Sequence, residues 1–240
     1  MVLQRLKRLA QQAGGAEEMD ELLGIEGSAA RLYFEHFNGM VKVEGEGASA
    51  PEQTSVVADP RRATAAPSDP TGIGPAEPLA RGPAAFDFQS RNRRPPRDPI
   101  NALLSFAYSM LAKDLTVICH SIGFDPFIGF YHQPRFGRPA LALDLMEGFR
   151  PLVADSAVLS AVNTRIVGAG DFIRVGDAVA LTPAGRKGFI RAYEQRIDTL
   201  VTHPLFGYRV SYRRVLEIQA RLLARLVTGE LLRYPGFETR

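Results

Sequence analysis

One stretch, residues 123–151, constrains the fold of this 240-residue chain more than any other. Up to Tyr131 it is apolar and aromatic and is interrupted by glycine and proline. His132 follows, and the prolines and glycine of residues 134–139 keep the next segment out of a helix. From Ala140 onward helix-forming residues return. The pattern predicts a stiff loop that ends in a buried helix.

This predicted helix holds two acids, Asp144 and Glu147, among leucine, alanine and methionine. Residues three apart share one helix face, so the carboxylates are neighbours. On spacing alone, two readings stay open. The acids are either the solvent face of the helix or a pair of carboxylates held in a cleft. In the second reading, His132 completes an oxygen, oxygen and nitrogen set suited to Mg²⁺ or Mn²⁺.

The charge is unevenly distributed along the chain. Residues 1–90 carry 8 Lys and Arg against 13 Asp and Glu, whereas residues 91–240 carry 21 against 13. A basic part of this size is typical of proteins that bind polyanions, although many basic proteins bind nothing specific. The single cysteine, Cys119, excludes an internal disulfide and fits a reducing cytosol. The first residues do not have the pattern expected of a signal peptide, and apolar stretches such as Leu103–Ala112 are expected to be too short to span a bilayer.

Two helices are predicted at the start of the chain, over residues 1–13 and 17–40. In the second helix Glu26 lies on the apolar stripe, with alanine and aromatic residues at helical offsets. An acid on a core-facing stripe is costly unless it is paired or binds a metal. Glu26 is therefore either salt-bridged, for example to Arg31, or a metal ligand.

Residues 41–85 differ from their surroundings, with seven prolines, five glycines and no aromatic residue. Such a segment buries too little apolar surface to offset the entropy of ordering it, which predicts a disordered insert within one domain. A stalk stiffened by proline follows, and its arginines suit phosphate contacts or form a solvated charge run. These are Arg91, Arg93, Arg94 and Arg97.

The rest of the chain is predicted to be mainly helical. Asp98 caps a central apolar helix over 101–119, and Thr182 caps another over 183–201. Further helices are expected over residues 155–164 and 212–232. The second is basic and amphipathic, so its basic face either binds phosphate or only faces solvent. A small β-hairpin is expected over 172–181. The predicted fold is a single mainly α domain over residues 1–240, and no phosphate-loop, serine or cysteine nucleophile motif accompanies it.

Three motifs occur together in one order: Leu23–Phe34, Arg91–Phe106 and residues 123–151. Together they resemble the CRISPR-associated integrase family, the catalytic protein of the spacer-acquisition complex. The resemblance continues through Arg186–Glu194 and covers nearly all of the chain outside residues 41–85. It implies a helical catalytic domain without the family's amino-terminal β domain, and therefore a poor integrase when this chain acts alone.

The resemblance also implies a ligand set for Mg²⁺ or Mn²⁺, namely Glu26, His132 and Glu147, with Asp144 as a further acid at the same site. The implied substrate is double-stranded DNA, both spacer precursor and CRISPR repeat. The implied partners are a second copy of the chain and a small ferredoxin-like adaptation protein, in the cytoplasm of a prokaryote.

The implied chemistry is attack of a DNA 3′-hydroxyl on a phosphodiester, which inserts short foreign DNA into a CRISPR array. Two alternatives stay open. One is a metal-dependent nuclease that only cuts, with water as nucleophile. The other is a non-catalytic DNA-binding or assembly subunit left by loss of the β domain.

Overall fold

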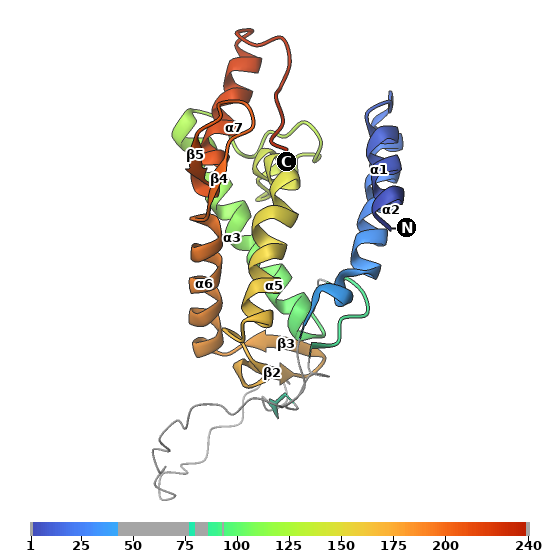
Figure 1. Cartoon of the computed structure of the whole chain (residues 1–240), viewed down its shortest axis with the longest axis vertical. Coiled ribbons are helices and arrows are strands. Elements are labelled where there is room, and N and C mark those ends of the chain that lie inside the picture. Colours follow the sequence, from blue (N-terminus) through green and yellow to red (C-terminus); the bar gives the residue numbers. More distant parts are fainter. Residues whose placement is uncertain (1, 43–76, 80–85, 93, 239–240) are drawn as a thin grey trace, which may run out of the picture.

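The protein is mainly α-helical, as predicted, in a computed structural model that describes residues 2–42, 77–79, 86–92 and 94–238 (Figure 1). The seven α-helices of this part are α1 (Val2–Ala13), α2 (Met19–Glu35), α3 (Pro99–Ile122), α4 (Ala140–Met146), α5 (Ser156–Asn163), α6 (Pro183–Ile197) and α7 (Tyr212–Val227). Short 3-10 helices cover Phe37–Met40, Glu147–Phe149 and Ala169–Asp171, and a wider π-helix covers Arg150–Asp155. The second, sixth and seventh α-helices end four or five residues before their predicted ends.

Helix α3 forms the centre of the core. Asp98 caps it as predicted, its side chain accepting a hydrogen bond from the backbone N–H of Asn101 at 2.8 Å. Gly123 ends the helix with a φ of 103°, which favours glycine. Helix α3 is long and apolar enough to cross a membrane, but core helices of soluble proteins meet the same two criteria. Here it packs against α4, α5, α7 and strand β3.

A small sheet lies at one end of α3, α5 and α6 (Figure 1). The predicted hairpin is confirmed: β2 (Phe172–Val175) pairs antiparallel with β3 (Ala178–Leu181). A third strand, β1 (Glu77–Pro78), pairs with β2 and belongs to the segment predicted as an insert. Residues 43–76 and 80–85 of that segment lie outside the described residues, so most of the predicted insert stays a prediction.

A second sheet was missed by the sequence analysis. It consists of β4 (Leu200–Thr202) and β5 (Arg209–Ser211), which pair antiparallel between α6 and α7. Each strand has only three residues, and none of them is buried. The alternation of apolar and polar residues that identifies a half-buried strand is therefore absent.

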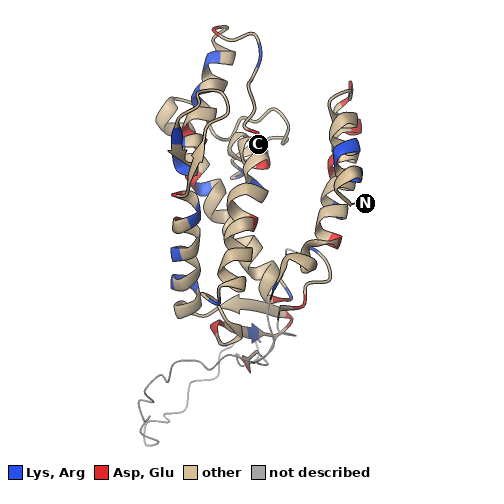
Figure 2. Ribbon diagram, viewed as in Figure 1, with Lys and Arg blue, Asp and Glu red and all other residues tan. Residues whose placement is uncertain are grey.

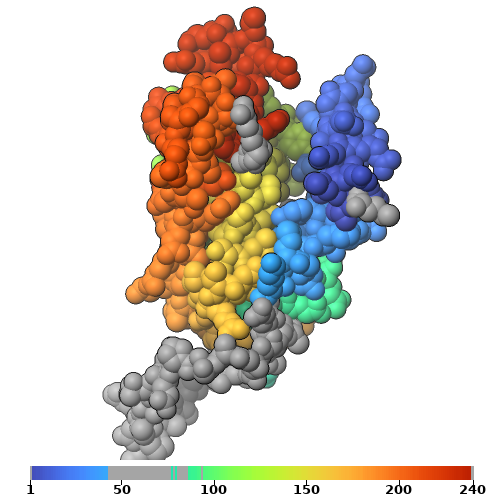
Figure 3. Space-filling view, in the orientation of Figure 1, coloured from blue at the N-terminus to red at the C-terminus, as the bar shows by residue number. Residues whose placement is uncertain are grey.

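Helices α1 and α2 pack on each other and form an arm beside the rest of the molecule, which we call the body (Figure 1). A recess separates the upper end of the arm from the body (Figure 3). The lower end is attached, because Leu32 and Phe37 are buried there and Tyr33 and Phe34 pack against the core. The arm is thus held at its base, while its upper half is largely exposed, including Met19 and Leu23.

Most arginines of α7 form ion pairs with acidic residues of the same chain. Basic residues also follow α6 and the region of β4 and β5 (Figure 2). Arg213 pairs with Glu194 and Asp198, at 2.5 and 2.9 Å. Arg214 and Arg221 both pair with Glu217, which lowers the pKa of that carboxyl. Of the two interpretations of this basic helix, these ion pairs favour the one in which its basic face only faces solvent.

Candidate functional site

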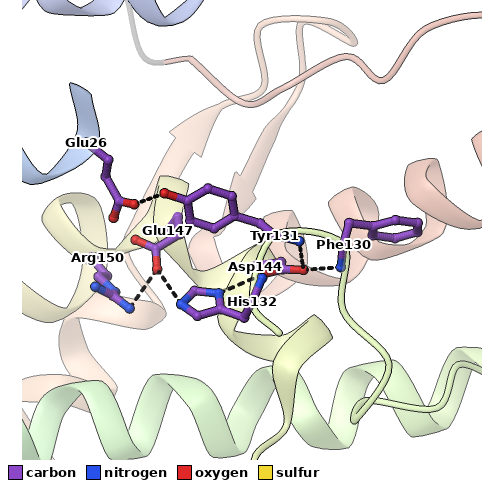
Figure 4. Close-up of polar contacts among 7 residues, drawn as sticks. All are labelled: Glu26, Phe130, Tyr131, His132, Asp144, Glu147 and Arg150. Atoms are coloured by element: carbon purple, nitrogen blue, oxygen red, sulfur yellow. Dashed lines mark hydrogen bonds and ion pairs between the residues drawn. The ribbon is translucent and has the colours of Figure 1, made fainter. Parts of the chain in front are cut away.

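Three of the predicted site residues reach one cleft from three separate elements. Glu26 comes from α2, His132 from the loop after α3, and Glu147 from the turn that follows α4 (Figure 4). The cleft has a volume of about 900 Å³. Its lining also includes five arginines, Arg91, Arg94, Arg135, Arg138 and Arg150. A pair of acids and a histidine within a mostly cationic wall suits a phosphate-bearing ligand.

Asp144 holds the loop that carries His132. Its carboxylate accepts hydrogen bonds from three successive backbone N–H groups, those of Phe130, Tyr131 and His132, at 2.6, 3.0 and 2.8 Å. The loop can come this close because residue 129 is glycine. A Cβ there would lie 2.8 Å from the Asp144 carboxylate and 2.8 Å from the Cβ of Ala140. Asp144 is thus a largely buried anchor for the loop, with its side chain 11% exposed.

The same carboxylate orients the imidazole of His132. The Nδ1 atom of His132 lies 2.7 Å from Oδ1 of Asp144. An Nδ1–H donated to a carboxylate leaves the lone pair on Nε2, which is the arrangement found for metal-ligating histidines. Nε2 lies 3.7 Å from Oε1 of Glu147. Asp144 and Glu147 therefore both face His132, which supports the cleft reading over the solvent reading of these acids.

Glu147 also contacts a cation. The guanidinium of Arg150 lies 2.7 Å from Oε1 of Glu147 and 5.2 Å from the ring centroid of Tyr108. Both the ion pair and the ring contact fix the position of Arg150 at the cleft wall. A phosphate that entered the cleft would meet Arg150 beside Glu147.

Glu26 is bound by a residue that the sequence analysis did not single out. The hydroxyl of Tyr131 donates a hydrogen bond to Oε2 of Glu26 (Figure 4). Burial raises the pKa of Tyr131, and the hydrogen bond to Glu26 raises it further, so the hydroxyl keeps its proton. This contact joins the arm to the loop of the body at the cleft. Tyr131 directly precedes His132, which is the only signal of its role in the sequence.

The donor set suits a divalent cation in its chemistry. Two carboxylates and an imidazole nitrogen are ligands that Mg²⁺ and Mn²⁺ accept, and the Asp144 contact is the outer-shell partner that such a histidine needs. As arranged, however, Glu26 is bound by Tyr131 and Glu147 by Arg150. Within the described part of the chain, no three His, Cys, Asp or Glu side chains lie close enough together to hold one ion. To share an ion, the acids must exchange these protein partners for it.

The predicted stalk arginines play different roles. Arg91 fastens the stalk to α3, donating to Oδ1 of Asn101 at 2.6 Å and to the hydroxyl of Ser105 at 3.1 Å. Arg94 lines the cleft. Arg97 is exposed and is not among the residues that line the cleft. Arg93 lies outside the described residues.

A buried carboxylate of the body, Asp155, ties the arm to the body at Tyr33, which lies two helical turns from Glu26 on α2. Asp155, 2% exposed, accepts hydrogen bonds from the hydroxyls of Tyr33 on α2 and Tyr108 on α3, at 2.9 and 2.7 Å. Burial raises the pKa of Asp155, while the two hydroxyls oppose that rise. This group was not predicted from the sequence, because a lone acid at the end of an apolar run looks like a helix terminus.

The comparisons with known proteins agree on a family. The model of the family "CRISPR associated protein Cas1" matches residues 1–67 and 78–195. A Cas4 exonuclease/Cas1 endonuclease fusion from Geobacter sulfurreducens is 48% identical over 225 residues, which is 94% of this chain and 34% of the fusion. A Cas1 endonuclease from Thermus thermophilus is 39% identical over 237 residues, 99% of this chain and 59% of that protein.

The fold agrees as well. A chain in the solved structure of a Cas6-RT-Cas1–Cas2 complex superposes with a TM-score of 0.69 at 26% identity, over 95% of this chain and 20% of that one. This chain spans about a third of the Geobacter fusion and under two thirds of the Thermus protein. The matched residues include Glu26, His132, Asp144 and Glu147. The chain therefore belongs to the CRISPR-associated Cas1 family.

Proposed function

We propose that the cleft is the metal-dependent active site of a DNA integrase and endonuclease, which inserts short foreign DNA into a CRISPR array. The observation that carries the proposal is the convergence of Glu26, His132 and Glu147 on one cleft whose other charged residues are arginines. Acids and a histidine in a cleft for a neutral ligand would not need that cationic wall. A DNA backbone needs both, since its phosphates must be bound and one of them must react.

In this proposal Glu26, His132 and Glu147 hold Mg²⁺ or Mn²⁺, which when bound polarises the scissile phosphate and stabilises charge on the attacking and leaving oxygens. The chain's own residues do the rest. Asp144 keeps the Nδ1–H of His132 occupied, so that Nε2 faces the cleft. Arg150, held between Glu147 and Tyr108, is placed to bind a nonbridging phosphate oxygen. Arg94, Arg135 and Arg138 position the DNA backbone along the rim.

The nucleophile decides the outcome of the reaction. A DNA 3′-hydroxyl in the cleft gives strand joining, whereas water gives cutting alone. The non-catalytic alternative, a DNA-binding or assembly subunit, keeps the arginines but uses neither nucleophile. We also propose that the chain acts with a second copy of itself and with a small ferredoxin-like adaptation protein. The structural similarity to a chain of a Cas6-RT-Cas1–Cas2 complex supports an adaptation partner.

One assay separates the three functions. The full chain, together with the proposed adaptation partner, is incubated with Mn²⁺, a labelled DNA duplex bearing free 3′-hydroxyls and an unlabelled CRISPR-repeat duplex. We expect label in a longer, joined product. A shortened product alone would assign a nuclease. DNA binding with neither product would assign the non-catalytic subunit.

The matched control for this assay lies on the same helix as Glu26. Glu26→Gln removes a proposed ligand, whereas Glu21→Gln changes an exposed acid of α2. We expect the first variant to lose joined and cut products and the second to keep them.

A further inference from the structure

The upper half of the arm is joined to the body by a side chain that does not line the cleft. Leu32, near the lower end of α2, is the one buried residue of that helix, all of which the structure describes. Above it, the hydroxyl of Tyr131 donates a hydrogen bond to Oε2 of Glu26 (Figure 4). Glu26 lines the cleft and Tyr131 does not. Tyr131 therefore holds a cleft residue from outside the cleft.

Tyr131 is itself fixed to the body. Its backbone N–H donates to the Asp144 carboxylate at 3.0 Å, in the same set of hydrogen bonds that anchors His132. Its ring meets the imidazole of His132 edge-on, with the ring centroids 5.4 Å apart. The loop thus presents the hydroxyl from a fixed position, so the contact with Glu26 restrains the arm.

The same contact occupies an acid that the proposed ion needs. Among the described residues, the hydrogen bond from Tyr131 is the one polar contact of the Glu26 carboxylate. In this arrangement Glu26 is not close enough to His132 and Glu147 for the three to hold one ion, so it must turn or move toward them. A divalent cation attracts a carboxylate more strongly than a neutral hydroxyl does, because it carries two full charges. The ion and the hydroxyl therefore compete for Glu26.

We propose that Tyr131 is a latch: its hydroxyl holds Glu26, and with it the upper half of the arm, against the body while the cleft is without metal, and it gives Glu26 up when the ion binds. The proposal rests on the proposed function and adds a positioning residue to it. Such a latch lowers the apparent affinity for the ion, because the binding-competent arrangement of Glu26 is populated only when the hydroxyl has let go.

The base of the arm decides the sign of the effect. Tyr33 is tied to the buried Asp155 two turns from Glu26, a distance of about 10 Å along a helix. A helix held this close keeps Glu26 beside the cleft without the latch. Removal of the Tyr131 hydroxyl should therefore end the competition with little loss of position, so the ion should bind more tightly.

The first test is hydrogen exchange of the full, metal-free chain in EDTA, measured by mass spectrometry. Tyr131→Phe keeps the ring that contacts His132 and removes only the hydroxyl. The control is Tyr208→Phe, because Tyr208 is exposed and its ring stacks on Phe206 far along the chain from the loop. We expect the backbone amides of residues 23–30 to exchange about 5- to 30-fold faster in Tyr131→Phe, with the control unchanged. Equal exchange in Tyr131→Phe and wild type would overturn the latch.

The second test is Mn²⁺ affinity, measured by electron paramagnetic resonance of the free ion. We expect Tyr131→Phe to bind Mn²⁺ about 5- to 30-fold more tightly than wild type and the Tyr208 control. Saturating Mn²⁺ should also return the exchange of residues 23–30 in Tyr131→Phe to the wild-type rate, because the ion then holds Glu26. Damage to the site would weaken binding, so a merely structural role of Tyr131 does not produce this result.

The outcomes separate this proposal from the proposed function. Unchanged or weaker Mn²⁺ binding by Tyr131→Phe, in a wild-type chain that binds the ion, would overturn the latch and leave the metal site standing. A wild-type chain that binds no Mn²⁺ would overturn the proposed metal site and, with it, the exchange of the hydroxyl for an ion.

Discussion

The loop and turn that carry His132 and Glu147 are built onto the core of the body, whereas Glu26 is carried by an arm attached mainly at its base. Asp144 fixes the loop through three backbone hydrogen bonds and one to the imidazole. Among the described residues Glu26 has one hydrogen bond, to Tyr131, and its helix is tied to the body two turns away through Tyr33 and Asp155. Half of the candidate site is therefore preformed, and the other half depends on where the arm lies.

The largest expected effect comes from removing a proposed ligand from either half. Glu26→Gln, His132→Ala and Glu147→Gln should each lower Mn²⁺-dependent cleavage or joining by at least about 100-fold, since metal stabilisation of the reacting oxygens is worth several kcal/mol. DNA affinity, measured by filter binding, should change little because arginines supply most of it. Near wild-type activity of the Glu26 variant alone would show that the arm contributes nothing to the chemistry.

A smaller effect is expected from Asp144→Asn, which acts on the preformed half. The amide keeps the size of the side chain and loses the charge that orients His132. Loss of such an outer-shell partner costs about 10- to 100-fold in metal affinity. The Mn²⁺ affinity is measured by titrating each protein with Mn²⁺ and detecting the free ion by electron paramagnetic resonance. An unchanged affinity would contradict the role of Asp144 as the group that positions His132.

A matched pair of tyrosines tests the attachment of the arm. Tyr33→Phe and Tyr108→Phe each remove one hydrogen bond to the buried Asp155, so each should lower the free energy of unfolding by about 1–3 kcal/mol in urea denaturation. Only Tyr33 lies on the arm, and only its loss should also weaken Mn²⁺ binding, by a few-fold. Equal Mn²⁺ affinity in the two variants would mean that this tie does not position Glu26.

The smallest expected effect is a pH dependence of stability that arises from Asp155, the acid to which Tyr33 and Tyr108 donate. Burial raises the pKa of Asp155 above its ordinary 3.8, so the folded protein retains a proton that the unfolded chain has lost. The resulting stabilisation is complete below pH 3.8 and is lost as pH rises through the folded-state pKa. Asp155→Asn cannot titrate. The free energy of unfolding of wild type minus that of this variant should therefore fall as pH is raised from 3.8 toward neutrality. A difference that stays constant or rises would contradict a raised pKa for Asp155.

Much of this arrangement could be predicted from the sequence, because strong local signals carry it. The caps at Asp98 and Thr182, the hairpin and the central helix follow from side chains that act on their own backbone. Glu26, His132 and Glu147 were selected by motif, and the structure brings them to one cleft. Asp144 was predicted as a further acid lining the same site; its carboxylate contacts the backbone and imidazole of His132 and is not among the residues that line the cleft.

What could not be predicted depends on contacts between distant segments. Tyr131 is 105 residues from Glu26, and Tyr33 is 122 residues from Asp155, so no local pattern links either pair. The contacts of Arg91 with Asn101 and Ser105 were not predicted, because these partners lie on the following helix and carry no charge. The strands β4 and β5 were too short and too exposed to show a period.

The central claim is that Glu26 from the arm joins His132 and Glu147 of the body around one ion. The most direct test is the shift in melting temperature that Mn²⁺ induces in the wild-type chain and in Glu26→Gln, His132→Ala and Glu147→Gln, with Glu21→Gln as control. An ion bound only by the folded state raises the melting temperature, so wild type and control should show the shift. Each of the three ligand variants is expected to lose most of this shift. Retention of the wild-type shift by all three would contradict the site, and retention by Glu26→Gln alone would remove the arm from it.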